Sequence, residues 1–133
     1  LAETGADRVL LVTHSMGGLV ARALLRRDRA DRIARFVTLG GPHHGTVTAR
    51  LGLGRNARQM EPGNGWLAEL NRVETTAVPT LTTWSCGDQI VAPQATSRLI
   101  GAREVVLPGL GHMALATSPE VRDLIVADLL LPN

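Results

Sequence analysis

The sequence predicts an α/β fold, a parallel sheet flanked by helices, and three observations support this prediction. Short aliphatic segments at residues 9–13, 36–39, 81–85 and 104–107 have the length and composition of buried strands. Helical patterns or long connections separate these segments, as in the crossovers of a parallel sheet. Polar loops follow three of the strands, and the ligand sites of such sheets lie where the carboxyl ends of the strands meet.

The composition is that of one globular domain. The chain has 133 residues, of which 44% are hydrophobic and 20% are charged. Its formal net charge is only +2 and its basic residues are scattered, so we expect no nucleic-acid partner. No apolar run approaches the roughly 18 residues of a membrane span, and no signal peptide is visible. The single Cys86 excludes a disulfide within the chain and is predicted to fill an apolar space at a strand end.

The first strand, residues 9–13, is a continuous aliphatic run, which is typical of a strand covered on both faces of a sheet. A helix is predicted to follow it over residues 16–28. The helical periodicity separates a buried aliphatic stripe from an exposed basic face, with Leu19, Val20, Ala23 and Leu24 in the stripe and Arg22, Arg26 and Arg27 on the face. We therefore expect the aliphatic stripe to pack on the sheet.

The later elements follow the same alternation. The second strand ends at a Gly-Gly-Pro sequence, and the connection over residues 43–79 is predicted to hold one short helix near residues 66–72. The third strand is predicted to end at a Cys-Gly-Asp turn, and a glycine-rich loop over residues 108–112 follows the fourth strand. The last helix is predicted from residue 119 to residue 130, with Ser118 as its N-cap and Pro119 in its first position.

Three strand-end loops carry a serine, a carboxylate and a histidine, in the order Ser15, Asp88 and His112. A serine hydroxyl is a poor nucleophile until a base takes its proton, and an imidazole is an effective base when a carboxylate fixes its tautomer. This order is expected when a nucleophile elbow lies early in the sheet and its partners follow later strands. The pattern predicts a catalytic triad with Ser15 as nucleophile, Asp88 as acid and His112 as base.

The stretch VLLVTHSMGGLVARALL, residues 9–25, has the pattern of such an elbow. A sharp turn from strand to helix holds the serine in a strained backbone conformation, and small neighbours allow strand and helix to approach each other. Gly17 and Gly18 are predicted to provide that room. Because the helix N-terminus presents backbone N–H groups at the turn, the Met16 amide is a candidate oxyanion donor.

On four segments the sequence resembles the α/β-hydrolase superfamily, and within it the small bacterial triacylglycerol lipases and related esterases. These segments are VTHSMGGLVAR, FVTLGGPHHGT, CGDQIVAP and GLGHMALATSPEVRDLI, which together extend over nearly the whole chain. The resemblance implies the same roles for Ser15, Asp88, His112 and the Met16 amide. It also suggests a secreted or cell-envelope protein, although the chain itself does not determine the compartment.

Two features depart from the family's pattern. The family's elbow usually begins with Gly, where this chain has Thr13. The family's fold also has strands ahead of the elbow, and a loop after one of them gives the second oxyanion donor. We therefore interpret residues 1–133 as the carboxyl-terminal portion of a single α/β-hydrolase domain. The first strand of such a portion would expose one edge, through which the chain could self-associate.

The other titratable residues near the motifs are assigned mainly to structural roles, and no metal or cofactor is expected. His14 adjoins the nucleophile but is predicted on the opposite side of the strand, as a packed histidine. For His43 and His44 a metal pair, a supporting or substrate-lining role and a packed role stay open, although no carboxylate or cysteine accompanies them at a ligand spacing. Glu104 begins a strand, at the opposite edge of the sheet from the motifs. The other aspartates are expected to be solvated charges beside a strand, near a helix end or on helix exteriors: Asp7, Asp28, Asp31, Asp123 and Asp128.

These residues predict hydrolysis of carboxylic esters, as in a lipase or esterase, through an acyl-enzyme. Leu110, Met113 and Leu115 surround the base in sequence and predict an apolar substrate-lining surface. The connection over residues 42–79 is too short for a lid of more than one helix, which predicts an open site for short and medium acyl chains. An acyltransferase or thioesterase with the same triad, and a non-catalytic domain that binds a lipid or a partner, remain alternatives.

Overall fold

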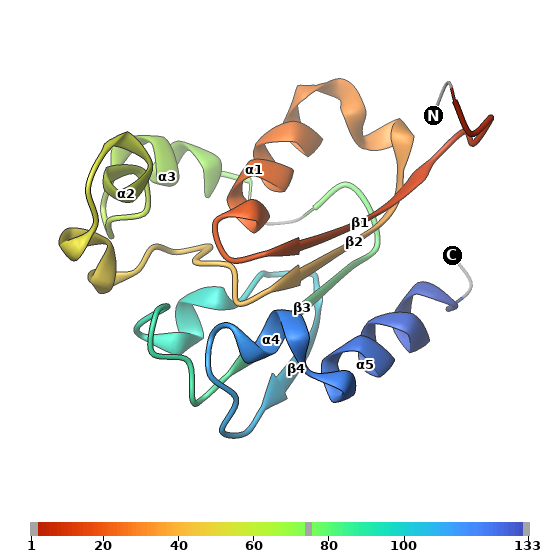
Figure 1. Ribbon diagram of the computed structural model, residues 1–133. Helices are drawn as coiled ribbons and strands as arrows, with labels where there is room; N and C mark the ends of the chain where they lie inside the picture. Colours follow the sequence, from red (N-terminus) through yellow and green to blue (C-terminus); the bar gives the residue numbers. More distant parts are fainter. Residues whose placement is uncertain (1–2, 74–75, 132–133) are drawn as a thin grey trace.

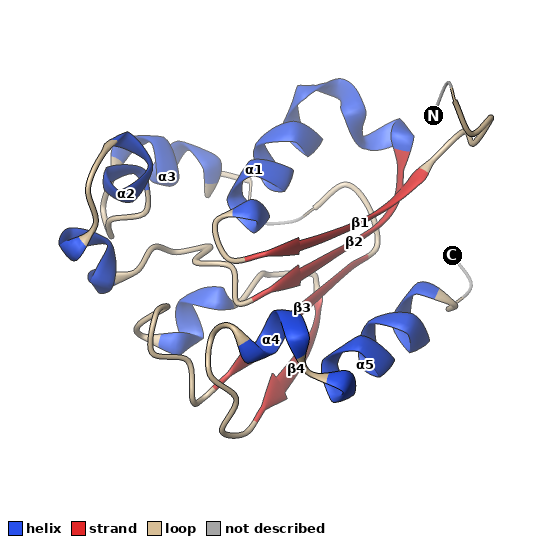
Figure 2. Ribbon diagram, viewed as in Figure 1, coloured by secondary structure: helices blue, strands red, loops and turns tan. Residues whose placement is uncertain are grey.

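The computed structural model describes residues 3–73 and 76–131, which form one four-stranded sheet with flanking helices (Figures 1 and 2). The strands, in their order across the sheet, are β1 (Val9–His14), β2 (Ile33–Leu39), β3 (Thr80–Ser85) and β4 (Arg103–Leu107). All neighbouring pairs are parallel. The predicted fold class is therefore confirmed, and the carboxyl ends of the four strands lie at one edge of the sheet.

Two apolar clusters lie on the two faces of the sheet. Successive side chains of a strand point to opposite faces, and β2 supplies both clusters in this way. Val37 and Leu39 pack with residues of α4 (Ala114–Thr117) and α5 (Pro119–Leu129). Phe36 packs on the other face with residues of α1 (Gly17–Leu24) and of the turn that continues it. The sheet is thus the middle layer of a three-layer arrangement.

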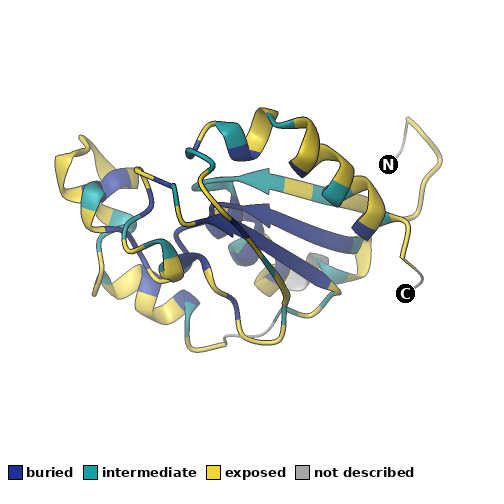
Figure 3. Ribbon diagram, turned by 90° about the horizontal axis from the view of Figure 1, so that it is seen from below, coloured by how far each residue is buried: buried dark blue, intermediate teal, exposed yellow. Residues whose placement is uncertain are grey.

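The first strand differs from the expected strand covered on both faces. In the described part of the chain, β1 pairs only with β2 and forms an edge of the sheet. Its side chains Val9, Leu10 and Val12 are exposed, whereas β2 and β3 are almost entirely buried (Figure 3). An aliphatic composition predicts that other elements pack on both faces of the strand, and the described residues provide only part of that packing.

The first helix buries only part of the predicted stripe, which includes Leu19, and it also buries one residue predicted on the solvent face. A π-helical turn (Leu25–Arg29) and a 3-10 turn (Ala30–Arg32) continue α1. Val20, which was assigned to the buried stripe, is 58% exposed, and Leu24 is exposed as well. Arg22, which was assigned to the solvent face, is only 4% exposed. Its guanidinium donates hydrogen bonds to the Leu70 carbonyl at 3.2 Å and to Oδ1 of Asn71 at 2.9 Å, which explains how a charged side chain is buried here.

The connection between β2 and β3 contains more helix than predicted. It holds a 3-10 helix (Val47–Leu51) and the short helices α2 (Arg55–Gln59) and α3 (Gly65–Leu70), and a further 3-10 helix (Gln94–Ser97) follows β3. α3 corresponds to the predicted helix, and its Leu67 and Leu70 pack on Leu19 of α1. The prediction of one helix was wrong because the other segments are too short to show a helical periodicity.

The last helix begins as predicted, with Ser118 at the N-cap and Pro119 in the first position. The prediction for Asp128 was wrong, since this residue is 1% exposed and does not lie on the solvated exterior of the helix. Its carboxylate lies 3.5 Å from Nη1 of Arg35 on β2 and 2.7 Å from Nη1 of Arg103 on β4. These ion pairs hold α5 against the sheet. None of the described helices has the length and apolar character that a bilayer-spanning segment needs.

Candidate active site

Ser15 lies between β1 and α1 in a strained backbone conformation. Its φ is 55°, and it is the one residue other than glycine with a positive φ in the described part of the chain. The Ser15 amide donates to the Leu39 carbonyl at 2.8 Å, and the Ser15 carbonyl accepts from the Gly18 amide at 3.0 Å. The turn is therefore held by β2 on one side and by the start of the helix on the other, as expected for a nucleophile elbow.

The elbow requires glycine at one of its two Gly positions. A Cβ at Gly18 would lie 2.5 Å from Oγ1 of Thr38 and 2.9 Å from Cε1 of His43, both of which are buried. A Cβ at Gly17 would lie 3.4 Å from Cβ of Thr13, which is an ordinary contact. Gly18 thus allows the close approach of helix and sheet, and Gly17 is not needed for room.

Asp88 and His112 form a buried pair at the same edge of the sheet. Nδ1 of His112 donates to Oδ2 of Asp88 at 2.7 Å, and the two residues are 5% and 2% exposed. The other carboxylate oxygen of Asp88 accepts from the amides of Ile90 at 2.8 Å and Val91 at 2.9 Å. The carboxylate is therefore fixed in direction, and it fixes the tautomer that leaves Nε2 of His112 able to accept a proton.

Two other chain segments support this pair. Thr46, in the loop after β2, donates to the Ile90 carbonyl at 3.0 Å and accepts from the Ala92 amide at 2.9 Å, which fastens the Asp88 turn to that loop. Nε2 of Gln94 donates to the main-chain carbonyl of Asp88 at 2.8 Å. Sequence reasoning missed both residues, because each acts through contacts with main-chain atoms of other residues, which no sequence motif shows.

Gly40 is a further site residue that sequence reasoning missed. Its φ is +54°, and a Cβ there would lie 2.9 Å from Cδ1 of Leu115, 3.2 Å from Oδ2 of Asp88 and 3.4 Å from Cε1 of His112. The backbone at the end of β2 therefore lies directly against the carboxylate of Asp88 and the imidazole of His112. The available signal was the Gly-Gly-Pro sequence that ends this strand.

The Met16 amide is placed as predicted, at the N-terminal end of α1, where Met16 is the N-cap residue. No carbonyl or side chain of the described residues accepts a hydrogen bond from it, so its N–H is available to a ligand. The same part of the chain provides no hydrogen-bond partner for the Ser15 hydroxyl. The hydrogen bond between the predicted acid and base is thus formed, and Ser15 lies at the end of β1, at the same edge of the sheet.

The three residues predicted to line a substrate surface differ in exposure. Met113 is 67% exposed, Leu110 is half-buried and Leu115 is fully buried in the cluster between the sheet and α5. The expectation for Leu115 is corrected, because its side chain packs behind Gly40 and does not reach an open surface. The prediction that Cys86 fills an apolar space was also wrong, since Cys86 is exposed.

The histidines beside the site have distinct surroundings. His43 is fully buried beneath the elbow, with Nε2 3.1 Å from Oγ1 of Thr38. Burial, with a further contribution from the positive charge of Arg22, lowers the pKa of His43 well below its usual value, so the ring is neutral. His44 is exposed, and no group of three metal-ligating side chains occurs within residues 3–73 and 76–131. His43 thus has a packing role.

His14 contradicts its predicted placement. It does not project away from the site, since Nε2 of His14 lies 2.9 Å from the carbonyl oxygen of His112 and the two imidazole rings are in contact. The strand alternation that motivated the prediction fails here because Ser15 leaves the strand in a left-handed conformation.

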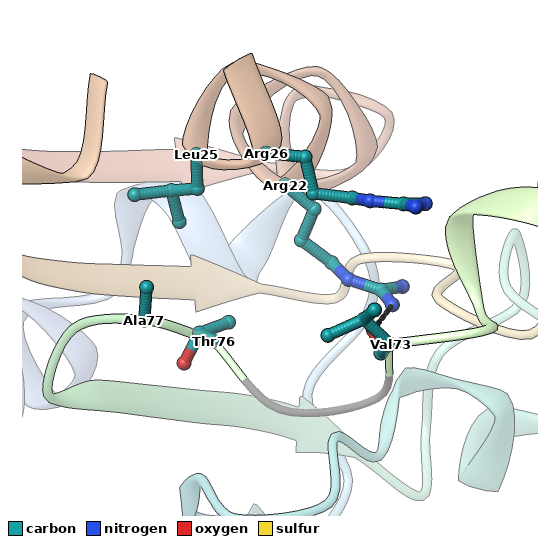
Figure 4. Close-up of a pocket in the computed structure, with 6 residues that line it drawn as sticks. All are labelled: Arg22, Leu25, Arg26, Val73, Thr76 and Ala77. Carbon is teal, nitrogen blue, oxygen red and sulfur yellow. Dashed lines mark hydrogen bonds between the residues drawn. The ribbon is translucent and has the colours of Figure 1, made fainter. Parts of the chain in front are cut away.

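A cavity of about 290 Å³ lies on the α1 side of the molecule (Figure 4). Its lining residues are Arg22, Leu25, Arg26, Val73, Thr76 and Ala77. Figure 4 shows the Arg22 side chain reaching Val73, whose carbonyl oxygen lies 3.5 Å from Nη2 of Arg22. No residue of the predicted triad lines this cavity, so it is separate from the candidate site.

Comparison with known proteins agrees with the fold. The family described as "PGAP1-like alpha/beta domain" matches residues 2–117. Phospholipase PlaB from Legionella pneumophila is 17% identical, with a TM-score of 0.74 over 95% of this chain and 44% of that one. A lipase from Bacillus licheniformis is 17% identical, with a TM-score of 0.73 over 90% of this chain and 66% of that one. Lipase B of Aspergillus fumigatus is 21% identical, with a TM-score of 0.70 over 82% and 33%. The chain thus spans between a third and about two thirds of the length of these structures.

Proposed function

Since the chain belongs to the family of PGAP1-like alpha/beta domains, we propose that it carries the catalytic triad of a serine hydrolase that cleaves carboxylic esters. One observation carries this proposal: the Asp88–His112 hydrogen bond lies at the same sheet edge as Ser15, whose φ is 55°. Packing alone does not require a buried acid–base pair beside a strained serine, whereas acyl transfer requires both. Lipases and a phospholipase among the similar structures agree with this reaction class.

The proposed reaction has two halves. Oγ of Ser15 attacks the ester carbonyl while Nε2 of His112 takes the hydroxyl proton, and the carboxylate of Asp88 stabilises the imidazolium. The tetrahedral intermediate collapses to an acyl-enzyme when His112 gives this proton to the leaving alcohol. Water then attacks the acyl-enzyme, with His112 again as base, and releases the carboxylic acid and free Ser15.

The Met16 amide is proposed as an oxyanion donor. Its N–H donates to no acceptor among the described residues and lies at the start of α1, where backbone donors and the helix dipole favour a negative charge. By analogy with lipases, we propose that a second donor comes from a segment ahead of the elbow.

We propose substrates with short and medium acyl chains. The exposed Met113 and half-buried Leu110 stand next to the base and offer an apolar surface with no charge for an ionic substrate. An open site of this kind predicts little rise in rate when a substrate such as tributyrin exceeds its solubility. A sharp rise at that concentration would contradict an open site.

The test of the function is covalent labelling combined with turnover. The intact protein is incubated with a fluorophosphonate and digested, and mass spectrometry locates the label, which we expect on Ser15. Hydrolysis of p-nitrophenyl butyrate is measured in parallel, with His112→Ala as the inactive reference. A protein that neither takes the label nor releases p-nitrophenol would support the non-catalytic alternative, and transfer of the acyl group to an added alcohol in preference to water would support an acyltransferase.

A further inference from the structure

His14 links the base to the strand that carries the nucleophile. Nε2 of His14 lies 2.9 Å from the main-chain oxygen of His112, and since a carbonyl only accepts, His14 is the donor. The ring centroids of the two histidines are 4.6 Å apart, with planes inclined by 42°. His14 therefore contacts both the main chain and the imidazole of the proposed base.

The main chain of His14 is fixed independently of these contacts. His14 is the last residue of β1 and is in register with Leu39 of β2. The carbonyl of the same Leu39 accepts from the Ser15 amide at 2.8 Å. One strand end thus determines the position of the nucleophile and, through the side chain of the preceding residue, that of the base.

The loop that carries the base needs such a restraint. His112 follows Gly109 and Gly111, and glycines leave the backbone with many accessible conformations. The Asp88 carboxylate holds only Nδ1 of the ring, about which the imidazole can still tilt. The His112 amide donates to Oε1 of Gln89 at 3.4 Å, and Gln89 is an exposed residue. Among the described residues, the hydrogen bond from His14, at 2.9 Å, is the shorter of the two that restrain the main chain of His112.

We propose that His14 is a positioning residue that sets the distance between the His112 imidazole and the Ser15 hydroxyl. This inference rests on the proposed ester hydrolysis. His14 takes no proton from substrate in this role; it donates Nε2–H to the base loop and supports one side of the base ring. A displacement of about 1 Å at a reacting group costs up to roughly 10²-fold in rate, so the effect should appear in kcat.

Two substitutions separate the hydrogen bond from the ring contact. His14→Gln keeps an N–H donor on a side chain of similar reach, and His14→Phe keeps an aromatic ring without a donor. With p-nitrophenyl butyrate and the intact protein, we expect His14→Phe to lower kcat about 10- to 100-fold with KM changed less than about twofold, and His14→Gln to recover most of that loss. Val12→Thr, on the same strand, is the matched control and should retain kcat within about twofold with an unchanged melting temperature.

A double-mutant cycle tests whether His14 acts through the base. In an Asp88→Asn background the orientation of His112 is already impaired, so adding His14→Phe should cost clearly less than it costs alone. Additive losses would contradict action through His112.

Other outcomes would also overturn the inference. If fluorophosphonate labels Ser15 in the natural protein and His14→Phe retains full kcat, the positioning role fails while the hydrolase assignment stands. A loss as large as that of His112→Ala, with no recovery in His14→Gln, would make His14 a chemical participant. Absence of any labelling in the natural protein would instead refute the proposed function itself.

Discussion

Nδ1 of His112 lies 2.7 Å from Oδ2 of Asp88, although the whole of β4 lies between the two residues in the chain. The parallel order of the strands produces this contact, because it places the loops that follow β3 and β4 side by side. The second oxygen of Asp88 is held by two main-chain amides, so the acid cannot turn away from the base.

Replacement of this acid should abolish most of the activity without unfolding the protein. We expect Asp88→Asn to lower kcat about 10³- to 10⁴-fold, because the amide stabilises the wrong tautomer of His112 and cannot balance the imidazolium. Ser15→Ala should lose about 10⁴-fold or more. The measurement is p-nitrophenyl butyrate hydrolysis, with circular dichroism as a check of folding. Turnover by Ser15→Ala at the natural rate would refute the triad, and a mild effect of Asp88→Asn would mean that another carboxylate supplies the acid.

Gly40 should tolerate no side chain, for two separable reasons. Gly40→Ala would impose a φ of +54° on a residue with a Cβ and would push that Cβ to 2.9 Å from Leu115, beside Asp88 and His112. Gly63→Ala is the matched control, since its φ is +82° but no atom lies within 4 Å of the added Cβ. We expect both to lose about 1–2 kcal/mol from backbone strain, and only Gly40→Ala to lose at least about tenfold in kcat. Equal kcat values in the two variants would show that Gly40 does not support the pair.

Asp128 should contribute strongly to stability although it lies far from the site. Asp128→Asn would remove the buried negative charge that pairs with Arg35 and Arg103, which we expect to cost about 3 kcal/mol in the free energy of unfolding. Asp123→Asn, on the exposed face of the same helix, breaks only a surface pair with Arg122 and should cost less than about 0.5 kcal/mol. Urea denaturation of both variants measures the difference, and similar midpoints would contradict a stabilising role for the buried ion pairs of Asp128.

Burial of His43 predicts a loss of stability in mild acid. Its pKa in the folded chain lies well below the usual value near 6.5, so the unfolded chain binds more protons between these two pKa values. Stability contributed by the neutral ring is therefore complete above about pH 6.5 and decreases as the pH falls toward the folded-state pKa. We expect the melting temperature of His43→Gln to fall less between pH 7 and pH 5 than that of the natural protein. His44→Gln, at an exposed neighbour, should behave like the natural protein, and an unchanged pH dependence in His43→Gln would contradict the prediction.

The exposed edge of β1 predicts self-association of residues 1–133 expressed by themselves. Val9, Leu10 and Val12 are exposed on a strand with one partner among the described residues, and an unpaired apolar edge favours pairing with another chain. Leu10→Lys should shift the elution volume in size-exclusion chromatography toward the monomer. Leu130→Lys removes an exposed leucine at the end of α5 and should not. A monomer before any substitution would disprove self-association.

The sequence by itself predicted the framework and the positions of the three residues that we propose as the triad. Strands show as short aliphatic runs and crossovers as the segments between them, and both signals are local in the chain. The positions of Ser15, Asp88 and His112 follow from the same reasoning, since the topology of a parallel sheet brings its strand ends together whatever the detailed packing. The Ser-Met-Gly-Gly sequence after an aliphatic run was enough to predict the elbow that the φ of Ser15 now describes.

Tertiary structure decided which residues support that framework. Arg22 is buried and Val20 is exposed, because the guanidinium of Arg22 donates hydrogen bonds to carbonyl oxygens of the distant α3 segment. Helical periodicity does not predict such a contact. Asp128 and His14 were misplaced for the same reason, since each is held by groups far away in the chain. A pattern of apolar residues specifies which face of an element is hydrophobic, whereas the burial of a polar side chain depends on the partner that the folded chain brings to it.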